Sequence, residues 1–360
     1  MSEIIALVTF LVGFVSVFMG VPYARKYLLS SGIYGKDQQK PGKPKLPTSG
    51  GLVVLFGFMF AVTAFLGLNN ILDLVAIQTE MVLAALSSAI MIALIGLVDD
   101  IHVGEKEFEI ETPTDRILGA IDVFDGDVRL REDEMDRIGL SQFNKMLFVL
   151  PAVFPLMAVG AGSYTMKLPF LGMIDWGLVY PLVLLPLGLL FVANVVNFLA
   201  GLNGLSPGTS LAASLGLGIF AFLNSKPEAM IVAFSLSGAL AAFLYYNWYP
   251  ASILPGDSLT YLSGAAMFSA IVLGDMEKFG VFIFIPWIIE FFLKTRSGFK
   301  AHSWGVVAEQ GLLPQHERTY SLTHPLMRKG FNEKEITSIL VLFEVFVVAA
   351  GLFLFQTGYL

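Results

Sequence analysis

Long apolar runs recur along this 360-residue chain and constrain its fold more than any other feature. About 17–25 mostly apolar residues are enough for a helix to cross a bilayer. Ten runs approach or reach this length: Ile4–Val21, Gly50–Leu68, Met81–Val98, Met146–Ala161, Gly177–Leu199, Thr209–Leu223, Ala229–Tyr246, Leu259–Leu273, Phe279–Leu293 and Ile336–Phe355. They lack the alternating polarity of membrane β-strands. The sequence therefore predicts an all-α integral membrane protein, a single polytopic domain over residues 1–360 with about ten transmembrane helices.

Composition supports this class of protein, because 56% of the residues are hydrophobic and the mean hydropathy is +0.73. No basic residue precedes the first run, and no small-residue cleavage site follows it. We interpret that run as a retained helix and not as a signal peptide. The chain has no cysteine, which excludes a disulfide framework.

Lys and Arg residues are distributed unevenly between the two sets of loops that ten spans would create. Of the 22 Lys and Arg residues, 19 fall in the loops on one side of the predicted membrane. Loops rich in Lys and Arg stay in the cytoplasm. The pattern predicts that both termini lie outside and that this set of loops lies inside. All four histidines belong to the same set, so we expect the active site on the cytoplasmic face.

Two adjacent carboxylates, Asp99 and Asp100, end the third apolar run. They repel each other unless a proton or a cation lies between them, and Mg²⁺ takes carboxylate oxygens. A solvated helix end is the alternative, although acidic residues are unfavourable at a helix C-terminus. Asp257, in the segment PGDS, also has two interpretations, either a metal ligand or an ordinary helix cap.

The uncharged segment NVVNFLAGLNGLSPG, Asn194–Gly208, follows a long apolar run and carries three asparagines. Carboxamides can bind metals and nucleobases, and Gly201 would let a ligand approach the backbone. Asn and Gly also end helices, so this segment alone leaves both interpretations open.

Two basic segments fall on the same predicted face. KPGKPKLPTSGG, at residues 40–51, places Lys43 and Lys45 among prolines and glycines. Such a loop suits either a bound phosphate or the anionic lipid surface. KTRSGFKAHSWG, at residues 294–305, has the same two interpretations. The motifs G-x-x-x-x-G-K-[ST] and G-x-G-x-x-G are absent, so the sequence does not indicate ATP-driven or dinucleotide chemistry.

The order of these motifs resembles that of the polyprenyl-phosphate N-acetylhexosamine-1-phosphate transferases, glycosyltransferase family 4. The resemblance is greatest to the members that act on UDP-GlcNAc and dolichyl phosphate. The matching pieces extend from Tyr34 to Gly264, and the pattern NxxNxLAGxNGL followed by NWYP…GD is the most specific. The resemblance implies transfer of an N-acetylhexosamine-1-phosphate, GlcNAc-1-phosphate first of all, from the UDP-sugar to a polyprenyl or dolichyl phosphate. UMP is released, in the first step of N-glycan or related glycan assembly.

The resemblance also assigns residues. Asn197 and Asp257 match the amide and the carboxylate that bind Mg²⁺, for which Mn²⁺ is an alternative, and Asn203 matches the asparagine that contacts uracil. The remaining matches are Asp99 and Asp100, assigned to acceptor activation or to positioning, and Lys145, a phosphate contact. The other expected substrate-binding residues are Gly201, Lys43, Lys45, Arg296, Lys300 and His302.

Some positions depart from the family pattern. Val103 stands where an Asp or Asn is usual, and Thr48 stands where a Glu often occurs. The last cytoplasmic loop, residues 294–335, lacks a clean form of the histidine- or arginine-rich sugar motif. The sequence therefore specifies the reaction class better than the donor sugar.

The loop at residues 103–143 is long and acidic, whereas the relatives are compact there. EFEIE alternates with period two and FDGD is a turn signal, which together predict a small β-rich cytoplasmic insertion. A disordered acidic loop is the alternative.

A secondary transporter and a non-catalytic lipid-binding protein are the competing classes. Transporters place ionisable residues inside the membrane, and Glu290 and Glu344 fall within predicted spans. Bonding between helices also accounts for both residues. The partners expected besides the substrates are membrane lipid and, as one arrangement, a second copy in a homodimer, with no nucleic acid. The compact length favours the plasma membrane of an archaeon, and the endoplasmic reticulum is the alternative.

Overall fold

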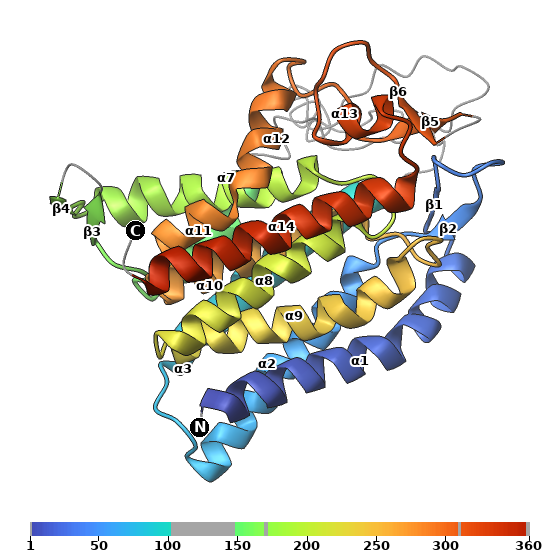
Figure 1. Ribbon diagram of the computed structural model, residues 1–360. Helices are drawn as coiled ribbons and strands as arrows, with labels where there is room; N and C mark the ends of the chain where they lie inside the picture. The colour runs from blue at the N-terminus through green and yellow to red at the C-terminus, as the bar shows by residue number, and fades with distance from the viewer. Residues whose placement is uncertain (1, 102–147, 169–171, 309–310, 358–360) are drawn as a thin grey trace, which may run out of the picture.

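A computed structural model describes residues 2–101, 148–168, 172–308 and 311–357 of the chain, and Figure 1 shows long helices running side by side. The helices are α1 (Ser2–Ser30), α2 (Gly51–Leu72), α3 (Thr79–Asp100), α6 (Phe154–Ala158), α7 (Leu185–Phe198), α8 (Leu205–Leu223), α9 (Pro227–Asn247), α10 (Gly256–Leu273), α11 (Glu277–Ile283), α12 (Ile285–Thr295), α13 (Thr323–Arg328) and α14 (Glu333–Gln356). A 3-10 turn, Leu150–Val153, precedes α6, and a π-helical turn, Tyr180–Leu184, leads into α7. The insertion at 103–143 and Lys145 lie outside the described residues, so both remain predictions.

Within the described residues, seven helices are long and apolar enough to cross a membrane. They are α1, α2, α3, the continuous helix Tyr180–Phe198, α8, α9 and α14. Each overlaps one of the ten predicted apolar runs. The prediction of a helical integral membrane protein is therefore confirmed.

The other three predicted runs are not among these seven helices. Leu259–Leu273 lies within α10, whereas Phe279–Leu293 is divided between α11 and α12 at Phe284. The break falls just before Pro286, whose ring nitrogen cannot donate a backbone hydrogen bond. The described part of Met146–Ala161 contains two helical residues, Phe148 and Val149, followed by the 3-10 turn and the short helix α6. The count of ten spans remains a prediction.

Three small antiparallel hairpins join the helices in the described ranges. Their strands are β1 (Tyr34–Lys36) with β2 (Lys45–Pro47), β3 (Thr165–Leu168) with β4 (Gly172–Asp175), and β5 (Gly305–Val307) with β6 (Leu312–Pro314). In the first hairpin Tyr34 lies opposite Pro47, and in the third Gly305 lies opposite Pro314. The hairpins lie in the connections between α1 and α2, between α6 and α7, and between α12 and α13.

Helix α10 forms the centre of the bundle, where it packs against α2, α3, α7, α8, α9 and α11. Two glycines let neighbouring helices reach its first turn. A Cβ atom on Gly51 of α2 would lie 2.1 Å from the backbone nitrogen of Leu259. A Cβ atom on Gly96 of α3 would lie 2.6 Å from that of Ser258. Small residues allow such close approach of membrane helices, and here they bring α2 and α3 against the start of α10.

The loops that carry the sequence motifs gather at one end of the bundle. Figure 1 shows β1–β2, β5–β6 and α13 at that end, together with the start of α14. The β3–β4 hairpin and the two marked chain ends lie at the opposite end. We call the first end the polar end, and the Lys and Arg distribution predicts that it faces the cytoplasm.

Cysteine labelling tests that orientation, because the chain has no native cysteine. We expect Lys43→Cys and Glu317→Cys, both at exposed residues of the polar end, to react with a membrane-impermeant maleimide only after cells are permeabilised. The matched control is Met173→Cys in the β3–β4 hairpin, where the native side chain is 68% exposed, and this variant should react in sealed cells. Labelling of Lys43→Cys in sealed cells would reverse the predicted topology.

Candidate active site

Asp100, the last residue of α3, caps the start of α10. Its Oδ1 atom accepts a hydrogen bond from the backbone N–H of Asp257 (2.7 Å). Its Oδ2 atom accepts from the backbone N–H of Ser258 (3.2 Å) and from the Ser258 hydroxyl (2.8 Å). The residue before α10 is Pro255, which provides no side-chain cap. A carboxylate from another helix therefore stabilises the exposed amides of this N-terminus, where negative charge is favourable.

Gly256 makes the approach of Asp100 possible. Its φ angle is +70°, a conformation that side-chain-bearing residues rarely adopt. A Cβ atom on Gly256 would lie 2.2 Å from Oδ2 of Asp100. Only glycine can therefore occupy this position while Asp100 keeps its contacts with α10.

Asn197 contacts Thr260 in the first turn of α10, the turn that also carries Asp257. The Thr260 hydroxyl lies 3.1 Å from Oδ1 of Asn197 and 3.1 Å from the backbone carbonyl of Asp257. Asn197 comes from the end of α7, and both Asn197 and Asp257 are half-buried. The structure thus brings the expected amide and carboxylate ligands to the same helix start.

The buried side chain of Tyr261 lies near both the acidic pair of α3 and Asp257. This side chain is 1% exposed, and the carboxylates of Asp257, Asp99 and Asp100 all act on its hydroxyl. The acidic pair of α3 and Asp257 of α10 therefore lie within electrostatic range of one buried phenol. Such a concentration of negative charge is favourable next to a cation or opposite the amides of a helix N-terminus.

Asn203 lies in the turn between α7 and α8, in a network that joins three parts of the chain. Its Nδ2 atom donates to Oδ2 of Asp37 (3.0 Å) and its backbone N–H donates to Oε1 of Glu333 (2.7 Å). Lys40 forms ion pairs with both Asp37 (3.4 Å) and Glu333. We call Asp37, Lys40, Asn203 and Glu333 the amide clamp.

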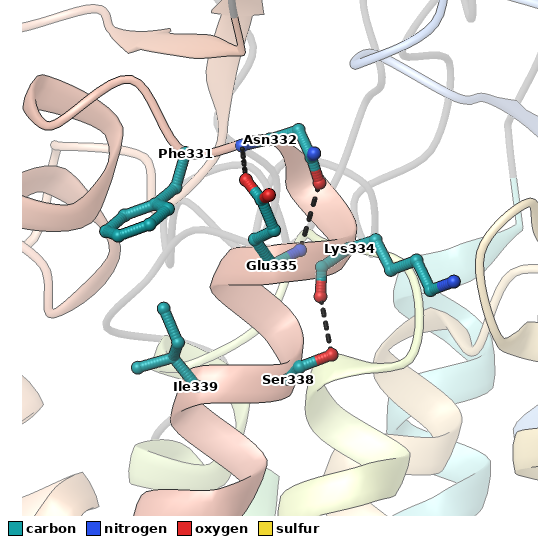
Figure 2. Close-up of a pocket in the computed structure, with 6 residues that line it drawn as sticks. All are labelled: Phe331, Asn332, Lys334, Glu335, Ser338 and Ile339. Atoms are coloured by element: carbon teal, nitrogen blue, oxygen red, sulfur yellow. Dashed lines mark hydrogen bonds between the residues drawn. The ribbon is translucent and has the colours of Figure 1, made fainter.

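The start of α14 is fixed next to the clamp by a capping box, in which Asn332 and Glu335 each accept the other's backbone N–H. Figure 2 shows both bonds at the edge of a surface pocket lined also by Phe331, Lys334 and Ile339. Glu333 is the first residue of α14. Because the capping box fixes the start of this helix, it also fixes the position from which the Glu333 side chain reaches Asn203.

The family assignment rests on comparison with known proteins. The model for glycosyl transferase family 4 matches residues 82–275, more than half of the chain. The chain belongs to this family. The matched segment contains the acidic pair, the asparagine turn and Asp257.

Relatives of this family 4 chain come from archaea, eukaryotes and bacteria. A Saccharolobus solfataricus protein is 30% identical over 338 residues, covering 93% of this chain and 90% of its own length. It is provisionally named UDP-N-acetylglucosamine–dolichyl-phosphate N-acetylglucosaminephosphotransferase. The Dictyostelium discoideum enzyme of that name is 24% identical over 75% of this chain and 67% of its own length. A Chlamydia muridarum phospho-N-acetylmuramoyl-pentapeptide-transferase is 29% identical over 59% of this chain and 63% of its own length.

The first basic loop of this family member holds its lysines in two different environments, and the substrate contacts of Lys43 and Lys45 remain a prediction. Lys43 and Lys45 are exposed, and Lys45 lies over the Tyr34 ring, 4.6 Å from its centroid. Lys40 is the lysine of this loop that enters the polar network. Sequence reasoning missed Lys40, Asp37 and Glu333. The only sequence signal was that the first two lie in the motif YGKDQQKPGKPK.

The last loop packs onto α12 through Glu290, whose side chain is completely buried. One carboxylate oxygen accepts the backbone N–H of Leu322 (2.7 Å), and the other accepts the Ser303 hydroxyl (3.2 Å) and lies 3.7 Å from Lys294. Glu290 thus holds the loop, which accounts for its burial without a transport pathway. Glu344 is also buried, and among the described residues neither of its oxygens has a hydrogen-bond partner.

The predicted substrate-binding residues of the last loop lie in two different places. His302 stacks on Trp304, with ring centroids 4.9 Å apart, and Trp304 packs against Gly201 in the asparagine turn. A Cβ atom on Gly201 would lie 3.1 Å from Trp304, and its φ angle is +101°. His302 and Gly201 are therefore joined through one indole ring, whereas Arg296 and Lys300 are exposed at the end of α12 and just beyond it.

Proposed function

We propose that this chain transfers GlcNAc-1-phosphate from UDP-GlcNAc to a polyprenyl or dolichyl phosphate, as the first step of N-glycan or related glycan assembly. The observation that carries the proposal is the start of α10, where Asp100 of α3 accepts the backbone N–H of Asp257 and Thr260, three residues further on, donates to Asn197. The names of the archaeal and eukaryotic relatives support the donor and the acceptor.

The reaction exchanges one phosphoanhydride bond for another. An oxygen of the lipid phosphate attacks the β-phosphorus of UDP-GlcNAc. The bond from that phosphorus to the bridging oxygen breaks, and the oxygen leaves with UMP. The product is a lipid-linked GlcNAc diphosphate. The chain must bind two negatively charged substrates and stabilise the charge that develops on the departing UMP.

Mg²⁺ is the proposed cofactor, and Asn197 and Asp257 are the residues that would hold it. Among the described residues no group of three or more His, Cys, Asp or Glu side chains forms a metal cage. One carboxylate and one amide nevertheless suit Mg²⁺, which keeps several waters and takes the remaining ligands from substrate phosphates. The bound ion would neutralise charge on the diphosphate, and Mn²⁺ could replace it.

Asp100 and Asp99 receive different roles in this proposal. Both oxygens of Asp100 accept hydrogen bonds from the start of α10, so Asp100 positions Asp257. Asp99, half-buried beside the same helix start, is proposed to act on the acceptor phosphate. We propose also that the polar end of the bundle faces the cytoplasm, as the distribution of Lys and Arg predicts. Two archaeal relatives, at 30% and 29% identity, support an archaeal plasma membrane.

A transfer assay tests the function directly. Membranes containing the chain are incubated with UDP-GlcNAc, UDP-GalNAc or UDP-glucose, each radiolabelled in the sugar, with dolichyl phosphate and Mg²⁺. We expect label in the lipid phase with UDP-GlcNAc, release of UMP in equal amount, and loss of both when EDTA is added. Membranes without the chain are the control. Lipid labelling from another sugar alone would change the donor, and absence of labelling from every sugar would contradict the transferase proposal.

A further inference from the structure

The amide clamp suggests how the donor base is selected. We propose that Asp37 is a positioning residue that fixes the Asn203 carboxamide with its oxygen toward the nucleobase, and so selects uracil over cytosine. This inference rests on the proposed function, in which Asn203 contacts the base of a UDP-sugar.

The hydrogen bond from Nδ2 of Asn203 to Oδ2 of Asp37 gives the amide one preferred orientation. Rotating the amide by 180° would put its oxygen against the carboxylate, and two acceptors facing each other repel. Asn203 and Asp37 are 4% and 3% exposed, so water cannot readily replace the lost bond. The rotated orientation is therefore disfavoured.

Lys40 holds the Asp37 side chain in place, and Glu333 holds the backbone of Asn203. Lys40 pairs with Asp37 and with Glu333, and its ammonium lies 4.2 Å from the centroid of the Tyr249 ring. Glu333 accepts the backbone N–H of Asn203, and Thr337, one turn further along α14, donates to the Asn203 carbonyl (3.0 Å). The backbone and the side chain of Asn203 are thus fixed by different residues, which leaves little freedom for the carboxamide.

The fixed orientation has a consequence for base recognition. Among the described residues, no hydrogen bond reaches Oδ1 of Asn203, so this acceptor remains available to a ligand. Uracil presents an N3–H donor between two carbonyl groups, whereas N3 of cytosine is an acceptor. An amide oxygen held in one place accepts from uracil N3–H and opposes the lone pair of cytosine N3. A freely rotating amide could pair with either base.

The test compares UMP and CMP as competitive inhibitors of the purified full-length chain. In Asp37→Asn the new amide can either accept from Asn203 or donate to it, so both orientations of Asn203 become possible. We expect the preference for UMP over CMP to fall roughly tenfold, about the contribution of one neutral hydrogen bond. The KM for UDP-GlcNAc should rise with little change in kcat. The matched control is Asp73→Asn, at the exposed end of α2, which should leave both values unchanged.

An exchange of the pair separates orientation from a general loss of structure. Asn203→Asp alone places two carboxylates together and should bind UMP weakly. In Asp37→Asn combined with Asn203→Asp, the new amide donates to one oxygen of Asp at 203 and leaves the other as a fixed acceptor. This double variant should restore the preference for UMP. If Asp37→Asn does not accumulate as folded protein, the comparison between these two variants decides the question.

The possible failures are distinguishable. The role of Asp37 would be overturned if folded, active Asp37→Asn kept the wild-type preference for UMP over CMP, or if the active exchange variant did not restore that preference. Either result would leave the proposed transferase function standing. A wild-type chain that neither transfers GlcNAc-1-phosphate nor prefers UMP would overturn the proposed function and this inference with it.

Discussion

Asp257→Asn is expected to lower kcat by at least ~100-fold, comparable to the loss of one strong electrostatic stabiliser in other active sites. The substitution keeps the shape of the side chain and the backbone N–H that bonds to Asp100, but it removes the anionic ligand proposed for Mg²⁺. Negative charge builds on the departing UMP as the bond breaks. Weaker cation binding therefore raises the free energy of the transition state more than that of the ground state. Initial rates at saturating UDP-GlcNAc, across a Mg²⁺ titration, measure the effect.

Two further variants make this test specific. Asp275→Asn applies the same chemical change at the opposite end of the bundle, where Asp275 pairs with Lys226 on the surface, and should behave as wild type. Asn197→Ala removes a neutral ligand, so raising Mg²⁺ should relieve part of its defect. Near-normal turnover by folded Asp257→Asn would show that Asp257 is an ordinary residue of the helix start and not a ligand of the catalytic metal.

Gly256→Ala is expected to reduce activity by about 100-fold, the scale of loss that a displacement of about 1 Å produces in a catalytic site. The new Cβ atom would meet Oδ2 of Asp100 at 2.2 Å, and alanine is strained at a φ of +70°. Asp100 must then move away from the first amides of α10, and Asp257 loses its support. The measurements are kcat and thermal stability of the purified protein.

Gly32→Ala separates the two causes of that loss. Gly32 has a φ of +75°, nearly the same backbone conformation, but no atom among the described residues lies within 4 Å of the added Cβ. It should therefore show only the small stability cost of the strained backbone. Equal activities for Gly32→Ala and Gly256→Ala would mean that the contact between Asp100 and α10 does not matter for catalysis.

The sequence predicted those parts of the fold and site that depend on local pattern. Hydropathy identified the long helices, because a membrane span is defined by its own composition. The motifs also placed Asn197, Asp257 and the acidic pair at helix ends, and the structure brings these ends together around Thr260 and Tyr261. The division of one predicted run at Phe284 was missed, because an apolar run reads the same whether it forms one helix or two.

The amide clamp could not be predicted, because its members pair through space. Lys40 and Lys43 are both lysines of one loop, and only the fold decides that Lys40 reaches Glu333 while Lys43 stays exposed. Asp37 and Asn203 are 166 residues apart, and neither has a local pattern that indicates the other. The role of Asp100 was left open for the same reason, since the amides that it caps belong to a distant helix.

The bonds from α14 to the asparagine turn also determine when the chain can begin to work during its own synthesis. Glu333 holds the backbone N–H of Asn203 from 130 residues further along the chain, and Thr337 holds the carbonyl of the same residue. Until α14 has left the ribosome and entered the membrane, both backbone groups lack these partners, and buried backbone groups require partners. On the proposed function, a nascent chain with every other helix inserted still cannot bind a nucleotide sugar in the native way. Consumption of UDP-GlcNAc is therefore expected to begin only once the polypeptide has been translated through α14.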